Sequence, residues 1–168
     1  MVTVRPAQPA DAAAVAAVHV GSWQAAYRGL VPDAYLDALQ PRDRQGRYRF
    51  GVEDADAPAT LVAVEDDAVL GFATTGPARG GEGDSCGELL ALYLDPVAWD
   101  RGIGRLLMAE ARAALSRRFA VAVLWVLKGN SRAERFYRAD GWAPDGRGRT
   151  EVVWGIAIDE IAYRRPLP

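Results

Sequence analysis

One stretch of the sequence decides the fold: ELLALYL (residues 88–94), DPVAWD (95–100) and RGIGRLLMAEARAALSRR (101–118). The apolar run at 88–94 predicts a strand that stops at Asp95-Pro96. After Gly102 the apolar residues recur at helical spacing. They are Ile103, Leu106, Leu107, Ala111, Ala114 and Leu115. The sequence therefore predicts a strand, Glu88 to Leu94, followed by a helix, Gly102 to Arg118, with glycines at its entrance.

The helix entrance, Asp100-Arg101-Gly102-Ile103-Gly104-Arg105, has the chemistry of an anion site. Glycines let a ligand approach the backbone, and unpaired amides and the helix dipole favour negative charge there. The dinucleotide fingerprint does not fit, because it requires a small third residue where Leu107 stands. No Gly-Lys-Ser/Thr follows, so a P-loop is excluded too. A ligand with a pyrophosphate group of another kind fits this pattern, and the alternative interpretation is a tight turn that binds no ligand. If a ligand binds, the side chain introduced by Gly104→Val would occupy the place of the pyrophosphate.

Toward the C-terminus, Ala120 to Leu127 is a continuous apolar run, typical of a central strand covered on both faces. Ser131 and Glu134 match a capping box that opens a helix ending near Asp140-Gly141. Two more strands fit between Trp142 and Arg165. On the predicted helix, Asn130, Ala133 and Tyr137 share one face, with a cap and a core aromatic as the alternative interpretation of Asn130 and Tyr137.

Toward the N-terminus, the patterns predict a mixture of strands and helices. We expect a strand over Val2–Arg5, helices over Pro9–Tyr27, Pro32–Leu39 and around Arg44–Phe50, and a hairpin of Leu61–Val64 and Val69–Thr75. No repeat or linker divides the chain. We therefore expect a single domain over residues 1–168, with a mixed α/β sheet and helices on both faces.

The composition excludes several classes of protein. The 168 residues carry a net charge of −2, which argues against a nucleic-acid partner because phosphate binding needs a basic surplus. One cysteine, Cys86, and one histidine, His19, can form neither an internal disulfide nor a structural zinc site, so no metal is expected. The sequence shows no signal peptide or membrane span, which favours a cytoplasmic protein without a membrane partner. We expect a monomer or a homodimer.

Two further features of the sequence resemble catalytic elements. Gly83-Asp84-Ser85-Cys86-Gly87 fits the Gly-x-Ser-x-Gly elbow of hydrolases, but that elbow needs a strand before it and a helix after it. Here a glycine-rich loop precedes and a strand follows. His19 lies in an apolar helix, which favours a packed core residue over a base.

Two motifs together resemble the GNAT superfamily of acyl-CoA-dependent N-acetyltransferases. The family loop Gln/Arg-x-x-Gly-x-Gly/Ala corresponds to Trp99-Asp100-Arg101-Gly102-Ile103-Gly104, with Trp99 replacing the usual Gln or Arg. Downstream, the family pattern of Asn followed by Ala-x-x-Phe-Tyr-x-x-x-Gly-Phe/Trp is matched in order and spacing. The matching residues are Asn130, Ala133, Phe136, Tyr137, Gly141 and Trp142.

The resemblance implies an α/β (α+β) fold with a twisted, mixed, mostly antiparallel sheet of six to seven strands and helices on both faces. It implies acetyl-CoA as cosubstrate, without a metal, in a V-shaped opening between the strands Glu88–Leu94 and Ala120–Leu127. Backbone groups of Leu92, Tyr93 and Leu94 would bind pantetheine and polarise the thioester carbonyl. The other implied cofactor-binding residues are Trp99, Asp100, Arg101, Gly102, Ile103, Gly104, Arg105, Asn130, Ala133, Phe136 and Tyr137.

The implied activity is direct transfer of the acetyl group to a primary amine of a small molecule or peptide, with a non-catalytic CoA-binding sensor as the alternative. Tyr137 would protonate the departing thiolate. Glu88 would deprotonate the amine, directly or through water, provided that burial raises its pKa; a solvated strand-end carboxylate is the alternative interpretation. Trp23 and Tyr27, at i and i+4, would form an aromatic wall against the acceptor or belong to the core.

Overall fold

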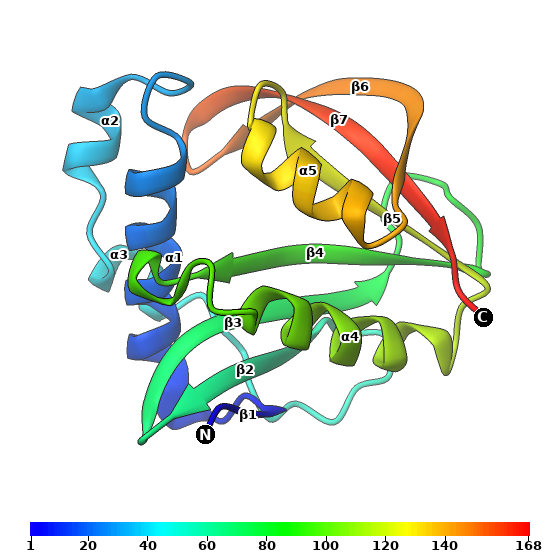
Figure 1. Ribbon diagram of the computed structural model, residues 1–168, viewed down its shortest axis with the longest axis horizontal. Coiled ribbons are helices and arrows are strands. Elements are labelled where there is room, and N and C mark those ends of the chain that lie inside the picture. The colour runs from blue at the N-terminus through cyan, green and yellow to red at the C-terminus, as the bar shows by residue number, and fades with distance from the viewer.

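A seven-stranded sheet forms the centre of the computed structural model, which describes residues 1–168 (Figure 1). The strands are β1 (Thr3–Pro6), β2 (Ala59–Glu65), β3 (Ala68–Pro77), β4 (Cys86–Leu94), β5 (Val121–Leu127), β6 (Ala143–Val153) and β7 (Ile156–Pro166). Their order in the sheet is β1-β2-β3-β4-β5-β7-β6, and β4 and β5 form the parallel pair among otherwise antiparallel neighbours. The predicted mixed, mostly antiparallel sheet is confirmed.

Helices cover both faces of this sheet, as predicted. They are α1 (Ala12–Ala26), α2 (Asp33–Ala38), α3 (Arg42–Gln45), α4 (Ile103–Ser116) and α5 (Ser131–Ala139), with 3-10 turns at Pro9–Asp11 and Pro96–Ala98. Neighbouring residues of β3 show the two faces: Phe72 packs with Val15 and Val18 of α1, whereas Ala73 packs with Leu107 of α4. Helices α4 and α5 share one face, because Tyr137 belongs to the same core cluster as Leu107 (Figure 1).

The two central strands separate part of the way along their length. Strand β4 pairs with β5 from Cys86–Val121 to Leu89–Leu124, and the pairing ends there. At the same point the register between β3 and β4 shifts, which leaves Leu90 without a partner in a β-bulge. A bulge bends its strand. The remainder of β4 therefore diverges from the end of β5, and the edges that face one another are left unpaired.

Two local predictions about helix ends are wrong. Asn130, not Ser131, caps α5: its side-chain oxygen accepts a hydrogen bond from the Ala133 amide at 3.3 Å. Glu134, the expected partner in the capping box, instead accepts the Tyr163 hydroxyl at 2.7 Å. A cap must stand before the first helical residue, and Asn130 reaches the free amide first.

The short helix predicted around Arg44–Phe50 lies earlier, at Arg42–Gln45. It begins directly after Pro41, whose ring presets a helical φ. The helix ends at Gly46, and the rings of Tyr48 and Phe50 then stack on each other and pack against the cluster around Phe72. No helix of the chain is long and apolar enough to cross a membrane.

Candidate active site

A cavity of about 1320 Å³ occupies the gap where β4 and β5 separate. Its lining includes Phe136 of α5, from one face of the sheet, and Trp23 of α1, from the other. The cavity therefore passes between the central strands and joins the two faces. A ligand that enters from the α4–α5 face can meet a second molecule that enters from the α1 face.

The N-terminus of α4 opens onto this cavity. Gly102 caps the helix with a φ of +79°, a left-handed conformation that favours glycine. No side chain caps the helix, so its first amides have no side-chain partner. Gly102 and Arg105 both line the cavity, and Arg105 forms no ion pair with an acidic residue. The helix dipole, the amides and this cation are the features on which the predicted anion site depends.

Gly104 lines the cavity, and its missing side chain also serves packing. A Cβ built on this glycine would lie 3.3 Å from Cε2 of Phe136 and 3.5 Å from Cδ1 of Leu94. The absent side chain therefore lets α4 pack closely against α5 and β4. A valine at this position would press on Phe136 and Leu94 even without a ligand, which adds a second reason for damage to the predicted one.

Two other residues of the predicted loop, Trp99 and Asp100, are held by the protein itself. The Trp99 indole N–H donates to the Leu94 carbonyl at 3.3 Å, and the Arg132 guanidinium lies 4.5 Å above the Trp99 ring. Arg132 also pairs with Asp100 at 2.9 Å. Trp99 therefore fills the usual polar position with a stacked, hydrogen-bonded ring, and it lines the cavity together with Asp100.

The structure places two predicted cofactor residues outside the cavity. Arg101 pairs with Glu65 of β2 at 2.7 Å, and Ile103 is 3% exposed in the core. The other predicted cofactor residues outside this loop are brought together along the cavity wall. They are Leu92, Tyr93, Leu94, Asn130, Ala133, Phe136 and Tyr137.

Tyr137 lies in the cavity wall, 9% exposed. Burial raises the pKa of its phenol, and charge on the neighbouring Tyr93 would raise it further. The hydroxyl therefore keeps its proton at neutral pH. This is the state that a proton donor requires.

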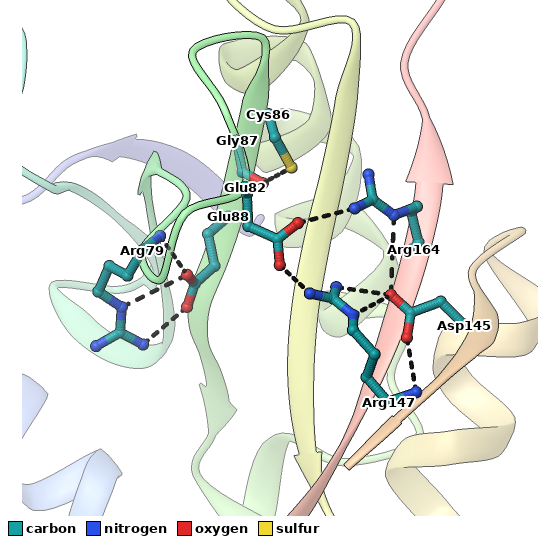
Figure 2. A network of polar contacts seen from close by, with 8 residues as sticks. All are labelled: Arg79, Glu82, Cys86, Gly87, Glu88, Asp145, Arg147 and Arg164. Carbon is teal, nitrogen blue, oxygen red and sulfur yellow. Dashed lines mark hydrogen bonds and ion pairs between the residues drawn. The ribbon is translucent and has the colours of Figure 1, made fainter. Parts of the chain in front are cut away.

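Glu88 also lines the cavity and is 1% exposed, in the segment of β4 that still pairs with β5. Its Oε2 is 2.8 Å from Nη2 of Arg79, and its Oε1 accepts the Arg79 amide at 3.1 Å and the Nε–H at 3.4 Å (Figure 2). The carboxylate is therefore not solvated. It anchors the loop before β4, and any proton transfer to it competes with Arg79.

A second set of ion pairs holds the other end of this loop (Figure 2). Glu82 pairs with Arg164 of β7 at 2.8 Å and with Arg147 of β6, which also pairs with Asp145 at 2.6 Å. Cys86 lies close to these ion pairs and is 1% exposed, and burial raises the pKa of its thiol. A buried thiol of this kind is a poor nucleophile.

Trp23 and Tyr27 lie together at the α1 side of the cavity, with ring centroids 4.8 Å apart. Both are buried in a core cluster and both line the cavity, so the core interpretation is confirmed and the contact with an acceptor stays a prediction. The Tyr27 hydroxyl is 3.4 Å from that of Tyr93. His19 stacks on Tyr93, and burial lowers the pKa of its imidazole to about 3, which keeps it neutral. His19 is a packed residue, as predicted.

Glu160 of β7 was missed in the sequence. It lies opposite Leu127, at the open end of β5, and its Oε1 is 3.0 Å from Nε of Arg149. Burial raises the pKa of its carboxyl, although Arg149 opposes this. The sequence contains one indication that Glu160 is unusual. Ile158, Glu160 and Ala162 share one face of the strand, so a carboxylate interrupts a row of apolar residues.

The fold and the site together define an acyl-CoA-dependent N-acetyltransferase. Parallel strands that separate, an uncapped helix N-terminus beside the gap and a protonated tyrosine within it suit transfer from an extended, anionic acyl donor. A family model described as "Acetyltransferase (GNAT) family" matches residues 22–142. The chain belongs to the GNAT acetyltransferase family.

Known proteins resemble the chain along its whole length. The uncharacterized N-acetyltransferase YuaI of Bacillus subtilis (strain 168) is 33% identical over 99% of this chain and 94% of its own. The protein yncA from Salmonella typhimurium, solved with its cofactor acetyl-CoA, matches with a TM-score of 0.73 and 22% identity, over 100% of this chain and 95% of its own. The PaiA N-acetyltransferase from Thermoplasma acidophilum, in complex with coenzyme A, gives a TM-score of 0.70 and 19% identity, over 99% of both chains.

Proposed function

We propose that this protein transfers the acetyl group of acetyl-CoA directly to a primary amine. The observation that carries the proposal is the gap between β4 and β5, which joins an anion site at α4 to a carboxylate-lined space on the other face. The solved relatives that contain acetyl-CoA or coenzyme A support this choice of donor. Acetyl-CoA would supply the acetyl group as an activated thioester.

Each side of the gap has a separate task. The free amides of α4 and the Arg105 guanidinium bind the pyrophosphate. The unpaired edge of β4, at Leu92 to Leu94, hydrogen-bonds the pantetheine arm and polarises the thioester carbonyl. The Tyr137 hydroxyl donates its proton to the thiolate sulfur as the carbon–sulfur bond breaks.

The ammonium group of the acceptor must lose a proton before it can attack. Glu88, the base predicted from the sequence, is held in three contacts by Arg79. Glu160 has a contact to Arg149 and a pKa that burial raises, so it holds a proton more readily than an exposed glutamate does. The geometry favours Glu160 as the base, with Glu88 as the carboxylate that anchors the loop.

Replacing Tyr137 tests the proposal. Tyr137→Phe should lower kcat by about ten- to a thousandfold, because the thiolate then leaves unprotonated, and should leave acetyl-CoA affinity nearly intact. Release of free thiol is followed over a broad panel of amines, and acetyl-CoA binding is measured by calorimetry. Tyr163→Phe is the matched control, because it removes a buried phenol that contacts Glu134 outside the cavity.

Two results would contradict the proposal. Equal kcat in Tyr137→Phe and in the wild type would remove Tyr137 from its role as acid. Tight acetyl-CoA binding without thiol release from any amine would favour the non-catalytic sensor.

A further inference from the structure

Arg44 of α3 is a half-buried cation without an acidic partner. Its Nε is buried and has no hydrogen-bond acceptor, and the guanidinium forms no ion pair. Two other arginines of the same cavity are neutralised, because Arg79 pairs with Glu88 and Arg149 pairs with Glu160. A desolvated charge without a partner costs free energy, so its retention in a cavity wall calls for a ligand that completes it.

Aromatic rings hold the Arg44 guanidinium in place. Its central carbon lies 4.2 Å from the centroid of the Trp154 ring, a cation–π contact. The ionisable side chains that affect its pKa are Tyr48, Tyr93 and Arg47, and burial lowers that pKa. No carboxylate is among them. The planar fork of the guanidinium is thus oriented by a ring face and lacks an anion.

The chain after Arg44 brings two more unpaired cations to the cavity. Arg47 and Arg49 line it and form no ion pair, and Asp54 is the acidic residue nearest to them along the chain that also lines it. The lining carboxylates that belong to strands are Glu88, Glu151 and Glu160, and each lies within 4 Å of Arg79 or Arg149. Three unpaired cations of the lining therefore belong to the segment 44–49, and the strand carboxylates are separate from it in the chain, a separation that a zwitterion could complement.

We propose that Arg44 binds an anionic group of the acceptor, so that the substrate is an amine that also carries a carboxylate or a phosphonate-like group. This inference rests on the proposed acetyl transfer and names its substrate class. The amine faces Glu160 and the thioester, while the anionic group reaches Arg44 against Trp154. Bidentate contacts of this kind suit both planar carboxylates and tetrahedral oxyanions.

Matched acceptors provide the test. Thiol release is measured with α-amino acids, their carboxamides and their aminophosphonate analogues, for the wild type, Arg44→Met and Arg42→Met. The wild type should prefer the anionic amine over the carboxamide by about ten- to a hundredfold in kcat/KM, the scale of hydrogen bonds to charged groups. Arg44→Met should bring that ratio close to one. Arg42 is exposed in the same helix and outside the cavity, so its variant should keep the preference.

The phosphonate arm identifies the anion: preference for carboxylate or for phosphonate supports the site in either case and names its geometry. A wild type that uses carboxamides as well as acids would overturn the inference. So would an Arg44→Met variant that loses activity on all acceptors by one factor while its melting temperature falls, which indicates a structural role.

A binding measurement separates this inference from the proposed function. The same amino acids are titrated calorimetrically into protein saturated with coenzyme A. Binding that Arg44→Met weakens at least tenfold, without thiol release in the wild type, would keep the anion site and remove the acetyltransferase proposal. Turnover of neutral amines without any effect of Arg44→Met would do the reverse.

Discussion

The two sides of the cavity are built in different ways. The side on which we propose that acetyl-CoA binds, called the cofactor side below, comes from one continuous part of the chain, from β4 through α4 and β5 to α5. It offers mainly backbone groups and the N-terminus of α4. The acceptor side is assembled from α1, α3 and the β6–β7 pair, and it offers side chains. The family model ends at residue 142, directly before β6.

This difference follows from what each side has to bind. A donor that is always the same can be held by amides and a helix dipole, which depend on the path of the chain more than on side chains. An acceptor is distinguished by its charge and shape, which only side chains can match. Mutations on the acceptor side should therefore change which amine reacts, whereas mutations on the cofactor side should change how well any amine reacts.

The largest effect is expected for Glu160→Gln on the acceptor side. Loss of the base should lower kcat/KM by about a hundredfold at neutral pH. Glu160 accepts a proton only when ionised, so wild-type activity should fall as the pH falls through its pKa, and burial places this limb above that of an exposed glutamate. In the Glu160→Gln variant this fall of activity at low pH should be absent. The dependence of kcat/KM on pH, measured for the wild type and the variant, tests this expectation.

Glu88→Gln is the matched comparison. It should lower the melting temperature, because it weakens the contacts with Arg79, and it should keep the acidic limb. A Glu88→Gln variant that loses the limb, beside a Glu160→Gln variant that keeps it, would return the role of base to Glu88.

A smaller effect is expected for Gly104→Val on the cofactor side. Its side chain would press on Phe136 and Leu94, and overpacking costs about 1–3 kcal/mol. We expect acetyl-CoA binding to weaken about tenfold by calorimetry, with a lower melting temperature and equal losses for all acceptors. Gly46→Val is the control, because a Cβ there meets no neighbour. A changed acceptor preference in Gly104→Val would break the division between the two sides.

The smallest effect is expected for Trp99→Phe. Phenylalanine keeps a ring beneath Arg132 but loses the hydrogen bond to the Leu94 carbonyl. A hydrogen bond of this kind contributes about 1 kcal/mol, so the KM for acetyl-CoA should rise by about two- to fivefold. Steady-state kinetics with varied acetyl-CoA measure this change. An unchanged KM would show that the Trp99 hydrogen bond does not shape the cofactor side.

The cofactor side could be predicted from the sequence because its signals are local. Gly102, Gly104 and Tyr137 lie in continuous motifs, and the strand–loop–helix order places them beside the gap. The packing role of Gly104 could not be predicted, since its neighbour Phe136 comes from another helix. The ion pair between Glu88 and Arg79 could not be predicted from the sequence either, because only the folded loop brings Arg79 to Glu88.

The acceptor side gave weaker signals. In the sequence Arg44 marks only the start of an expected helix, and its significance depends on Trp154, a residue far along the chain that lies against it. A sequence pattern cannot show that a charge lacks a partner, because partners arise from tertiary contacts. The alternation in β7 was the one local sign that Glu160 differs from its neighbours.

The divergence of β4 and β5 has a consequence for stability as well as for chemistry. An unpaired strand edge on the outside of a sheet invites another chain to add to it. Here the free edges face each other inside the molecule, where a slender chain that carries amide groups can pair with them. Pantetheine would thus act as a substitute strand, and the free energy of unfolding should rise with donor concentration, by about 2.7 kcal/mol at a hundredfold excess over Kd. The bound donor would then supply the hydrogen bonds that β4 and β5 do not form with each other.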